Sequence, residues 1–142
     1  DAGTPGISDP GFLLVRECVA QDVEVECLPG ATALIPAIVA SGFPCDKFHF
    51  EGFLPHKKGK QTRLNYLAEL PTTVVFYESP HRLVKSLNMM LPIFGADREI
   101  VVVRELTKMY EEHKRGSLSE VVKYFESKTV KGEIVVVVKQ KV

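Results

Sequence analysis

The first eleven residues, DAGTPGISDPG, bring three glycines, two prolines and two aspartates together in one loop. Glycines permit positive φ and a close approach of the backbone to a ligand, and prolines limit the entropy that a loop loses on binding. Such a composition is typical of a ligand-binding loop. Asp9 and Pro10 have the residue types of an N-cap and a first helical position, so we predict a helix over residues 10 to 20.

Ligand loops of open α/β sheets normally follow the carboxyl end of a strand. No strand and no initiator Met precede this loop in the sequence. We therefore expect the chain to be a fragment of a longer protein, whose upstream part supplies that strand. Any function then belongs to the intact protein.

Charge is unevenly distributed, although the formal net charge is zero. Residues 1 to 45 carry one basic residue, Arg16, against six acids, whereas the remainder carries 17 Lys and Arg against 12 acids. A basic half favours an anionic partner such as nucleic acid, and a solvated charged surface is the alternative. The three cysteines lack C-x-x-C spacing, which indicates reduced thiols in a cytoplasmic protein, and we expect no metal site.

Hydrophobic periodicity predicts alternating helices and strands, and therefore an α/β fold with a mixed sheet flanked by helices. Valine-rich segments are expected to be strands covered on both faces, and Ser117 with Glu120 is expected to form a capping box. Charge and loop chemistry change near residue 45, so we predict the tail of one α/β domain at 1–45 and a complete α/β domain at 46–142. The predicted strands are 23–28, 48–53, 72–77, 99–104, 110–116 and 133–139, and the further helices are 31–41, 60–70, 80–91 and 118–127.

Six sequence blocks occur in order along the whole chain. They are DAGTPGISDPG at 1–11, LPGATA at 28–33, FEGFLPHKKG at 50–59, FYESPHR at 76–82, VRELTKMYEEHKRG at 103–116 and KGEIVVVV at 131–138. With these blocks the chain resembles the C-terminal two thirds of the ribosomal RNA small subunit methyltransferase I family, within the tetrapyrrole methylase superfamily. A glycine loop alone is a weak signal, whereas six ordered blocks are a specific one.

The resemblance implies a homodimeric enzyme that transfers a methyl group from S-adenosylmethionine to the ribose 2′-hydroxyl of a cytidine in small-subunit ribosomal RNA. It also implies that residues 1–45 are the remnant of a Rossmann-like domain that binds the methyl donor, so this chain alone is expected to be inactive. Main-chain groups of two loops are the expected donor-binding groups, with an ordinary turn as the alternative at Pro29-Gly30. The expected cofactor-binding residues are Asp1, Ala2, Gly3, Thr4, Pro5, Pro29, Gly30, Ala31 and Thr32.

A ribose hydroxyl is a weak acid, so a general base would assist its methylation. Within the blocks, Glu78 or Glu105 is the candidate base and Arg82 a further catalytic candidate, but a Glu beside an Arg is as often a structural ion pair. Cations that follow strands are expected to hold RNA phosphates, although His81 is as compatible with packing on the sheet and the lysines with a solvated loop. The expected RNA-binding residues are His56, Lys57, Lys58, Lys60, Arg63, His81, Arg104 and Lys108.

Two other functions remain open. The same fold and donor serve sister families that methylate a tetrapyrrole or a modified protein side chain. The chain is also compatible with a non-catalytic RNA-binding or dimerisation module. Binding of S-adenosylmethionine separates the enzymes from the module, and direct tests of acceptors separate the enzymes.

Overall fold

The computed structural model of the protein describes residues 3 to 141. The chain divides into two compact units, Asp1–Ala33 and Leu34–Val142. The first unit contains α1 (Phe12–Ala20). The second contains, in chain order, α2 (Leu34–Ser41), β1 (Phe48–Phe53), α3 (Lys60–Ala68), β2 (Thr73–Glu78), α4 (Leu83–Phe94), β3 (Glu99–Arg104), β4 (Glu112–Ser117), α5 (Leu118–Glu126) and β5 (Ile134–Val138).

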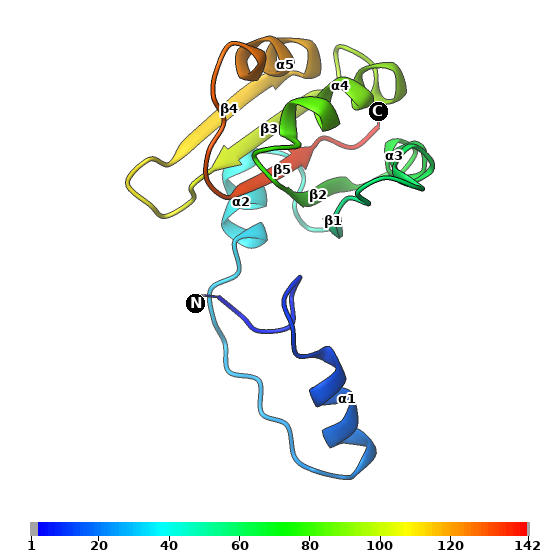
Figure 1. Cartoon of the computed structure of the whole chain (residues 1–142), viewed down its shortest axis with the longest axis vertical. Helices are drawn as coiled ribbons and strands as arrows, with labels where there is room; N and C mark the ends of the chain where they lie inside the picture. Colours follow the sequence, from blue (N-terminus) through cyan, green and yellow to red (C-terminus); the bar gives the residue numbers. More distant parts are fainter. Residues whose placement is uncertain (1–2, 142) are drawn as a thin grey trace. The chain divides into compact units, whose positions relative to one another are not determined.

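Within residues 3 to 141, five strands form one sheet in the order β1-β2-β5-β3-β4 (Figure 1). β1 and β2 are parallel, and the other neighbouring pairs are antiparallel. All of β5 and the inner residues of β3 are buried, which their β-branched valines favour. The prediction of a mixed sheet with doubly covered valine strands is confirmed.

Successive residues of β2, β3 and β5 enter opposite cores. Phe76, Val102 and Val136 face α3, α4 and α5, whereas Val137 faces α2, where it packs near Ile38. Burial of each such side chain is worth about 1.5–3 kcal/mol relative to exposure. The two cores fix the sheet, and with it the positions of the residues that follow β2 and β3.

The compact units divide at Ala33/Leu34, upstream of the domain boundary predicted at 45/46. The physical reason is α2, which buries Leu34, Ala37 and Ile38 against the sheet. Its carbonyl at Ala40 also accepts a hydrogen bond of 2.6 Å from Nη2 of Arg115. To which domain of the intact protein α2 belongs stays a prediction.

The helix α1 confirms the expectation for residues 10 to 20, but it begins at Phe12. Its N-cap residue is Gly11 at φ 140°, and no side chain caps it, so the predicted capping role of Asp9 and Pro10 is wrong. The positive φ of Gly11 turns the chain into the helix where a larger residue would be strained.

Residues 23 to 28 form no strand, and the prediction of one is wrong. Alternation of Val23 and Val25 with Glu24 and Glu26 specifies which face of a strand would be apolar. It does not supply a partner, and a strand requires hydrogen bonds to a neighbour. The described residues of the first unit contain no other strand with which this segment could pair.

Every other predicted element is present, with small shifts of its ends. The predicted capping box is confirmed: Ser117 Oγ accepts from the amide of Glu120, and a carboxylate oxygen of Glu120 accepts from the amide of Ser117. This exchange satisfies two of the amides that the start of α5 leaves without helical partners. It also fixes the point at which β4 ends and α5 begins.

Candidate functional site

In the first unit, the two loops expected to bind the cofactor lie against each other. The amide of Thr4 donates to the carbonyl of Ala31 (2.8 Å), and Thr32 Oγ1 donates to Thr4 Oγ1 (2.9 Å). Gly3 has φ 114°, in the region that favours glycine. The structure thus brings Gly3 and Thr4 together with Ala31 and Thr32, while Pro5 and Pro29 stay exposed beside them. Asp1 and Ala2 lie outside the described residues.

Gly30 lies beside Thr4 at this contact. A Cβ added there would be in ordinary van der Waals contact, 3.4 Å from Thr4 Oγ1, so the two loops pack closely. The paired loops therefore present exposed main-chain groups at close range, which is the type of surface that a polar small molecule binds.

In the second unit, Glu78 ends β2 inside a sealed ion network. Glu78 is 2% exposed. Oε2 accepts from Ser86 Oγ (2.5 Å) and Lys60 Nζ (3.3 Å), while Oε1 accepts from the Ser79 amide (2.8 Å) and Arg82 Nη2 (2.9 Å). Lys60 Nζ also donates to Ser86 Oγ (2.6 Å). Four donors therefore satisfy the buried carboxylate.

The same edge of the sheet holds Arg104. Glu78 and Arg104 both pair with Ile134 of β5, so they lie in one row across three strands. The strand spacing puts their Cα atoms about 10 Å apart, with both side chains on the face covered by α3, α4 and α5. The sequence suggested that Glu78 with Arg82 and Arg104 with Glu105 project into one cleft. These residues lie at the same edge of the sheet, but Glu78 does not line the cleft beside Arg104.

Arg104 and Glu105 tie the end of β3 to its surroundings. Arg104 Nε donates to Glu112 Oε2 (2.9 Å), and its Nη1 donates to the carbonyl of Lys131 (3.3 Å). Glu105 Oε1 accepts from the amide of Glu133 (2.8 Å) and from Lys108 Nζ (3.2 Å). Its main chain also bonds to Glu133, with the Glu105 amide donating to the Glu133 carbonyl (2.9 Å).

These contacts shift the protonation of both carboxylates. Hydrogen bonds from the Glu133 amide and from Lys108 hold the pKa of Glu105 below its usual value. Burial raises the pKa of Glu112, but hydrogen bonds from Tyr124 and Arg104 outweigh it, and the net direction is downward. Both groups are therefore ionised at neutral pH.

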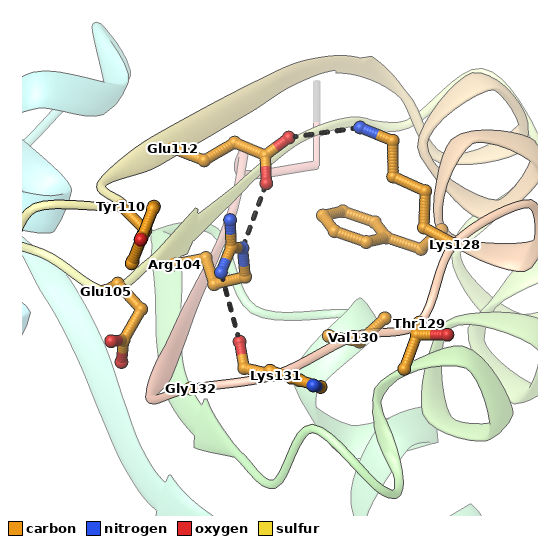
Figure 2. A pocket seen from close by; sticks show the side chains of 10 residues that line it. Arg104, Glu105, Tyr110, Glu112, Lys128, Thr129, Val130, Lys131 and Gly132 are labelled. Carbon is orange, nitrogen blue, oxygen red and sulfur yellow. Dashed lines mark hydrogen bonds and ion pairs between the residues drawn. The ribbon is translucent and has the colours of Figure 1, made fainter.

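A cleft of about 310 Å³ opens beside Arg104, and Figure 2 shows its lining side chains. β3 and β4 supply Arg104 and Glu112, and Tyr110 comes from the loop that joins them. The segment from the end of α5 to β5 supplies Lys128 and Lys131. The volume lies at the small end of the range for ligand pockets.

The basic loop before α3 keeps most of its predicted character. His56, Lys57 and Lys58 are exposed. Arg63 is also exposed, although its Nε donates to Glu51 Oε1 (2.5 Å). Lys60 is different, because it is 5% exposed and its ammonium is committed to Glu78 and Ser86. The prediction that Lys60 contacts RNA is therefore wrong.

His81 and Lys108 are exposed cation candidates, at different loops. The exposure of His81 excludes the alternative that it packs on the sheet. Arg82 is bound to Glu78, and its Nε and Nη1 are buried without a partner among the described residues. In the described part of the chain, no group of three or more metal-binding side chains lies together, and no helix is long and apolar enough to cross a membrane.

Sequence reasoning missed four residues of these sites. Ser86 joins Lys60 to Glu78, and Tyr110, Lys128 and Lys131 line the cleft. Tyr110 lies inside the block VRELTKMYEEHKRG, so the block was a usable signal for it. Lys131 likewise begins the block KGEIVVVV. Nothing in the sequence marks Ser86 and Lys128, because they are common residues brought to these sites only by the fold.

Comparisons with known proteins identify relatives over nearly the whole chain. The chain is 48% identical over 141 residues to "Ribosomal RNA small subunit methyltransferase I" of Thermotoga maritima, which covers 99% of this chain and 63% of the relative. It is 47% identical over 139 residues to the protein of that name from Synechocystis sp., with 97% of this chain and 50% of the relative covered. The chain thus spans between half and two thirds of the length of these relatives.

Among solved structures, the fold is similar to uroporphyrin-III C-methyl transferase from Thermus thermophilus, complexed with S-adenyl homocysteine. The TM-score is 0.66 at 20% identity, with 96% of this chain and 62% of that chain covered. Such a likeness concerns the fold alone. A family model described as Tetrapyrrole (Corrin/Porphyrin) Methylases matches residues 1–122. Because this match extends over far more than half of the sequence, the chain belongs to the tetrapyrrole methylase family.

Proposed function

We propose that the intact protein methylates the ribose 2′-hydroxyl of a cytidine in small-subunit ribosomal RNA, with S-adenosylmethionine as the donor. The observation that carries this proposal is the 48% identity to the ribosomal RNA small subunit methyltransferase I of Thermotoga maritima over 99% of this chain. The structural neighbour complexed with S-adenyl homocysteine, the demethylated form of this donor, supports the choice of donor.

The paired loops of the first unit fit part of such a donor. When bound, S-adenosylmethionine supplies an electrophilic methyl group on a sulfonium. Gly3, Thr4 and Pro5 together with residues 29–32 would offer main-chain amides and carbonyls to it. The Thr4 amide and the Ala31 carbonyl, which bond to each other, would hold the two loops in place. Asp1 and Ala2 belong to the same proposed set.

We assign the general base to Glu105 rather than to Glu78. Oε2 of Glu105 accepts no hydrogen bond from the described residues, whereas both oxygens of Glu78 are occupied in a buried site. Glu105 would accept the proton of the 2′-hydroxyl when that oxygen takes the methyl group from the bound donor. The lowered pKa of Glu105 makes it a weak base, so holding the hydroxyl in line contributes much of the rate.

Cations would hold the RNA backbone. His56, Lys57, Lys58 and Arg63 are exposed in and after the loop that precedes α3, and His81 and Lys108 are exposed in the loops after β2 and β3. Arg104 is the half-buried last residue of β3. Salt bridges occupy Arg63, Arg104 and Lys108 in part, so His56, Lys57 and Lys58 are the least committed. Contacts of this type position a substrate and do not read its sequence.

The test is transfer of labelled methyl from S-adenosylmethionine to unmethylated small ribosomal subunits. We expect the intact protein to label a cytidine ribose, located by nuclease digestion, and residues 1–142 alone to give no label. Absence of label from an intact protein that binds the donor would overturn the RNA acceptor. A tetrapyrrole acceptor would then be tested in the same assay.

A further inference from the structure

The connection between β3 and β4 presents two large side chains to solvent. Met109 is 89% exposed and Tyr110 is 69% exposed. Single exposed apolar side chains are common on protein surfaces, so the exposure of Met109 alone indicates no function. Tyr110 differs because its ring borders a cleft. The connection is also part of the cleft beside Arg104, because Tyr110 lines it.

This connection is held in a strained conformation. Glu105 and Thr107 have positive φ values of 51° and 65°, which non-glycine residues adopt rarely. Hydrogen bonds fix them: the Thr107 amide donates to Glu111 Oε2 (2.7 Å), and the Lys108 amide donates to the Glu105 carbonyl (3.0 Å). Strain that is fixed by several contacts is typical of functional sites. Tyr110 is therefore presented from a rigid support.

The opposite wall of the cleft is basic. Lys128 and Lys131 lie across from Tyr110 in Figure 2, with Arg104 between. Glu112 is already neutralised, because Oε2 accepts from Arg104 (2.9 Å) and Oε1 lies 3.7 Å from Lys128 Nζ.

Two donors of this wall are uncommitted. Within residues 3 to 141, neither Arg104 Nη2 nor Lys131 Nζ has a hydrogen-bond or ion-pair partner. An aromatic ring beside free cationic donors matches the chemistry of a nucleotide, which has a flat base and an anionic phosphate.

We propose that this cleft binds one unpaired nucleotide of a single-stranded RNA segment, with its base stacked on Tyr110 and its phosphate at Lys131 and Arg104 Nη2. The inference rests on the proposed RNA methyltransferase function, and it adds a subsite for a nucleotide. A duplex cannot occupy the cleft in this way, because its bases are stacked on one another.

The test uses the intact protein and a short fluorescein-labelled single-stranded oligoribonucleotide, measured by fluorescence anisotropy at several salt concentrations. We expect Tyr110→Ala to weaken binding about fivefold or more, and Tyr110→Phe to bind as the wild type does. Lys131→Ala should reduce the slope of log affinity against log salt by about 0.7, the value for one lost phosphate contact.

Two neighbouring substitutions serve as matched controls. Met109→Ala removes an exposed side chain that has no aromatic face, and Lys123→Ala removes an exposed cation from α5 outside the cleft. Both should bind the oligoribonucleotide as the wild type does. Thermal unfolding of each variant checks that the fold is kept, which the exposure of the substituted residues favours.

Methyl transfer to small ribosomal subunits is measured in parallel, and it separates two kinds of failure. A wild-type protein that methylates RNA, with a Tyr110→Ala variant that binds and methylates equally well, would overturn the cleft alone. A wild-type protein that neither binds nor methylates RNA would overturn both the cleft and the proposed function. Weakened binding of Tyr110→Ala but not of Met109→Ala supports the nucleotide subsite.

Discussion

The ends of β2 and β3 carry similar sequences, an acid and an arginine after a run of buried β-branched and aromatic residues, yet they form opposite kinds of site. Glu78 lies in a sealed network of four donors under α3 and α4. Glu105 follows β3, two strands further along the same edge, and keeps an oxygen free beside an open cleft.

The difference originates in what covers each strand end. Behind β2, Lys60 begins α3 and Ser86 lies in the first turn of α4, so two helices close over the carboxylate. Behind β3, the loop 105–111 meets the segment 128–132, and the missing side chain of Gly132 leaves room for Glu105. Helix cover therefore buries Glu78, whereas loop cover leaves Glu105 partly exposed.

The largest expected effect comes from a substitution in the buried network around Glu78. Glu78→Gln leaves the ammonium of Lys60 buried without its countercharge, which should lower the free energy of unfolding by about 3–5 kcal/mol. Urea unfolding of the variant and the wild type measures this loss. An unchanged midpoint would mean that the network carries no net stabilisation.

A double-mutant cycle checks the cause of that loss. Lys60→Met removes the stranded charge, so the double variant with Glu78→Gln should lose less stability than the sum of the two single losses. Strict additivity of the two losses would contradict a direct interaction between Lys60 and Glu78.

Local patterns in the sequence predicted most of the second unit. The valines of β3 and β5 specified doubly covered strands, and Ser117 with Glu120 specified the start of α5, because these signals act between near neighbours. The strand at 23–28 failed because pairing depends on a partner elsewhere in the chain, which alternation does not reveal.

The candidate site was predicted less well, because long-range contacts decide it. Lys60 was assigned to RNA from its place in a basic run, but the fold brings it to Glu78, 18 residues away, and buries both. Tyr110 meets Lys128 and Lys131 only through the pairing of β3 with β4 and β5. Residue types suggested the chemistry, and the topology decided which residues share a site.

On the open side, Glu105→Gln should lower the rate of methyl transfer about a hundredfold, since a positioned general base typically contributes that much or more. The urea midpoint should fall much less than that of Glu78→Gln, because the glutamine keeps an oxygen that can accept from the Glu133 amide and the side chain is 18% exposed, not fully buried. Single-turnover transfer to small ribosomal subunits measures the effect. An equal fall for Glu78→Gln under conditions where that variant remains folded would remove the functional distinction between the two acids.

Substitution of Gly132 tests whether the position of the Glu105 side chain depends on the missing side chain at residue 132. An alanine Cβ at Gly132 would collide with the Glu105 side chain, whereas Gly95, which has the same φ of 90°, faces open space. Both Gly→Ala variants should lose about 1–2 kcal/mol of stability from the strained backbone. Only Gly132→Ala should also slow methyl transfer, and equal transfer rates in the two variants would contradict the role of Gly132.

The smallest expected effect is the stability that Glu105 and Glu112, beside the cleft, lose in acid. Interactions with Arg104, Lys108, Tyr124 and the Glu133 amide lower the pKa values of Glu105 and Glu112 below the ordinary 4.5. Because the unfolded chain then binds more protons near that pH, stability is fully present above about pH 5 and falls as the pH drops through the folded-state values.

Urea midpoints measured between about pH 6 and pH 3 should therefore decline toward acid, and the decline should be shallower in Glu112→Gln than in the wild type. Salt should reduce this difference, because the groups are near solvent and their charges are screened. If Glu112→Gln does not change how the urea midpoint depends on pH, the response to acid comes from other carboxylates. The ion pair between Glu112 and Arg104 would then only shape the wall of the cleft. A shallower slope would mean that the ionised Glu112, paired with Arg104, stabilises the end of β3.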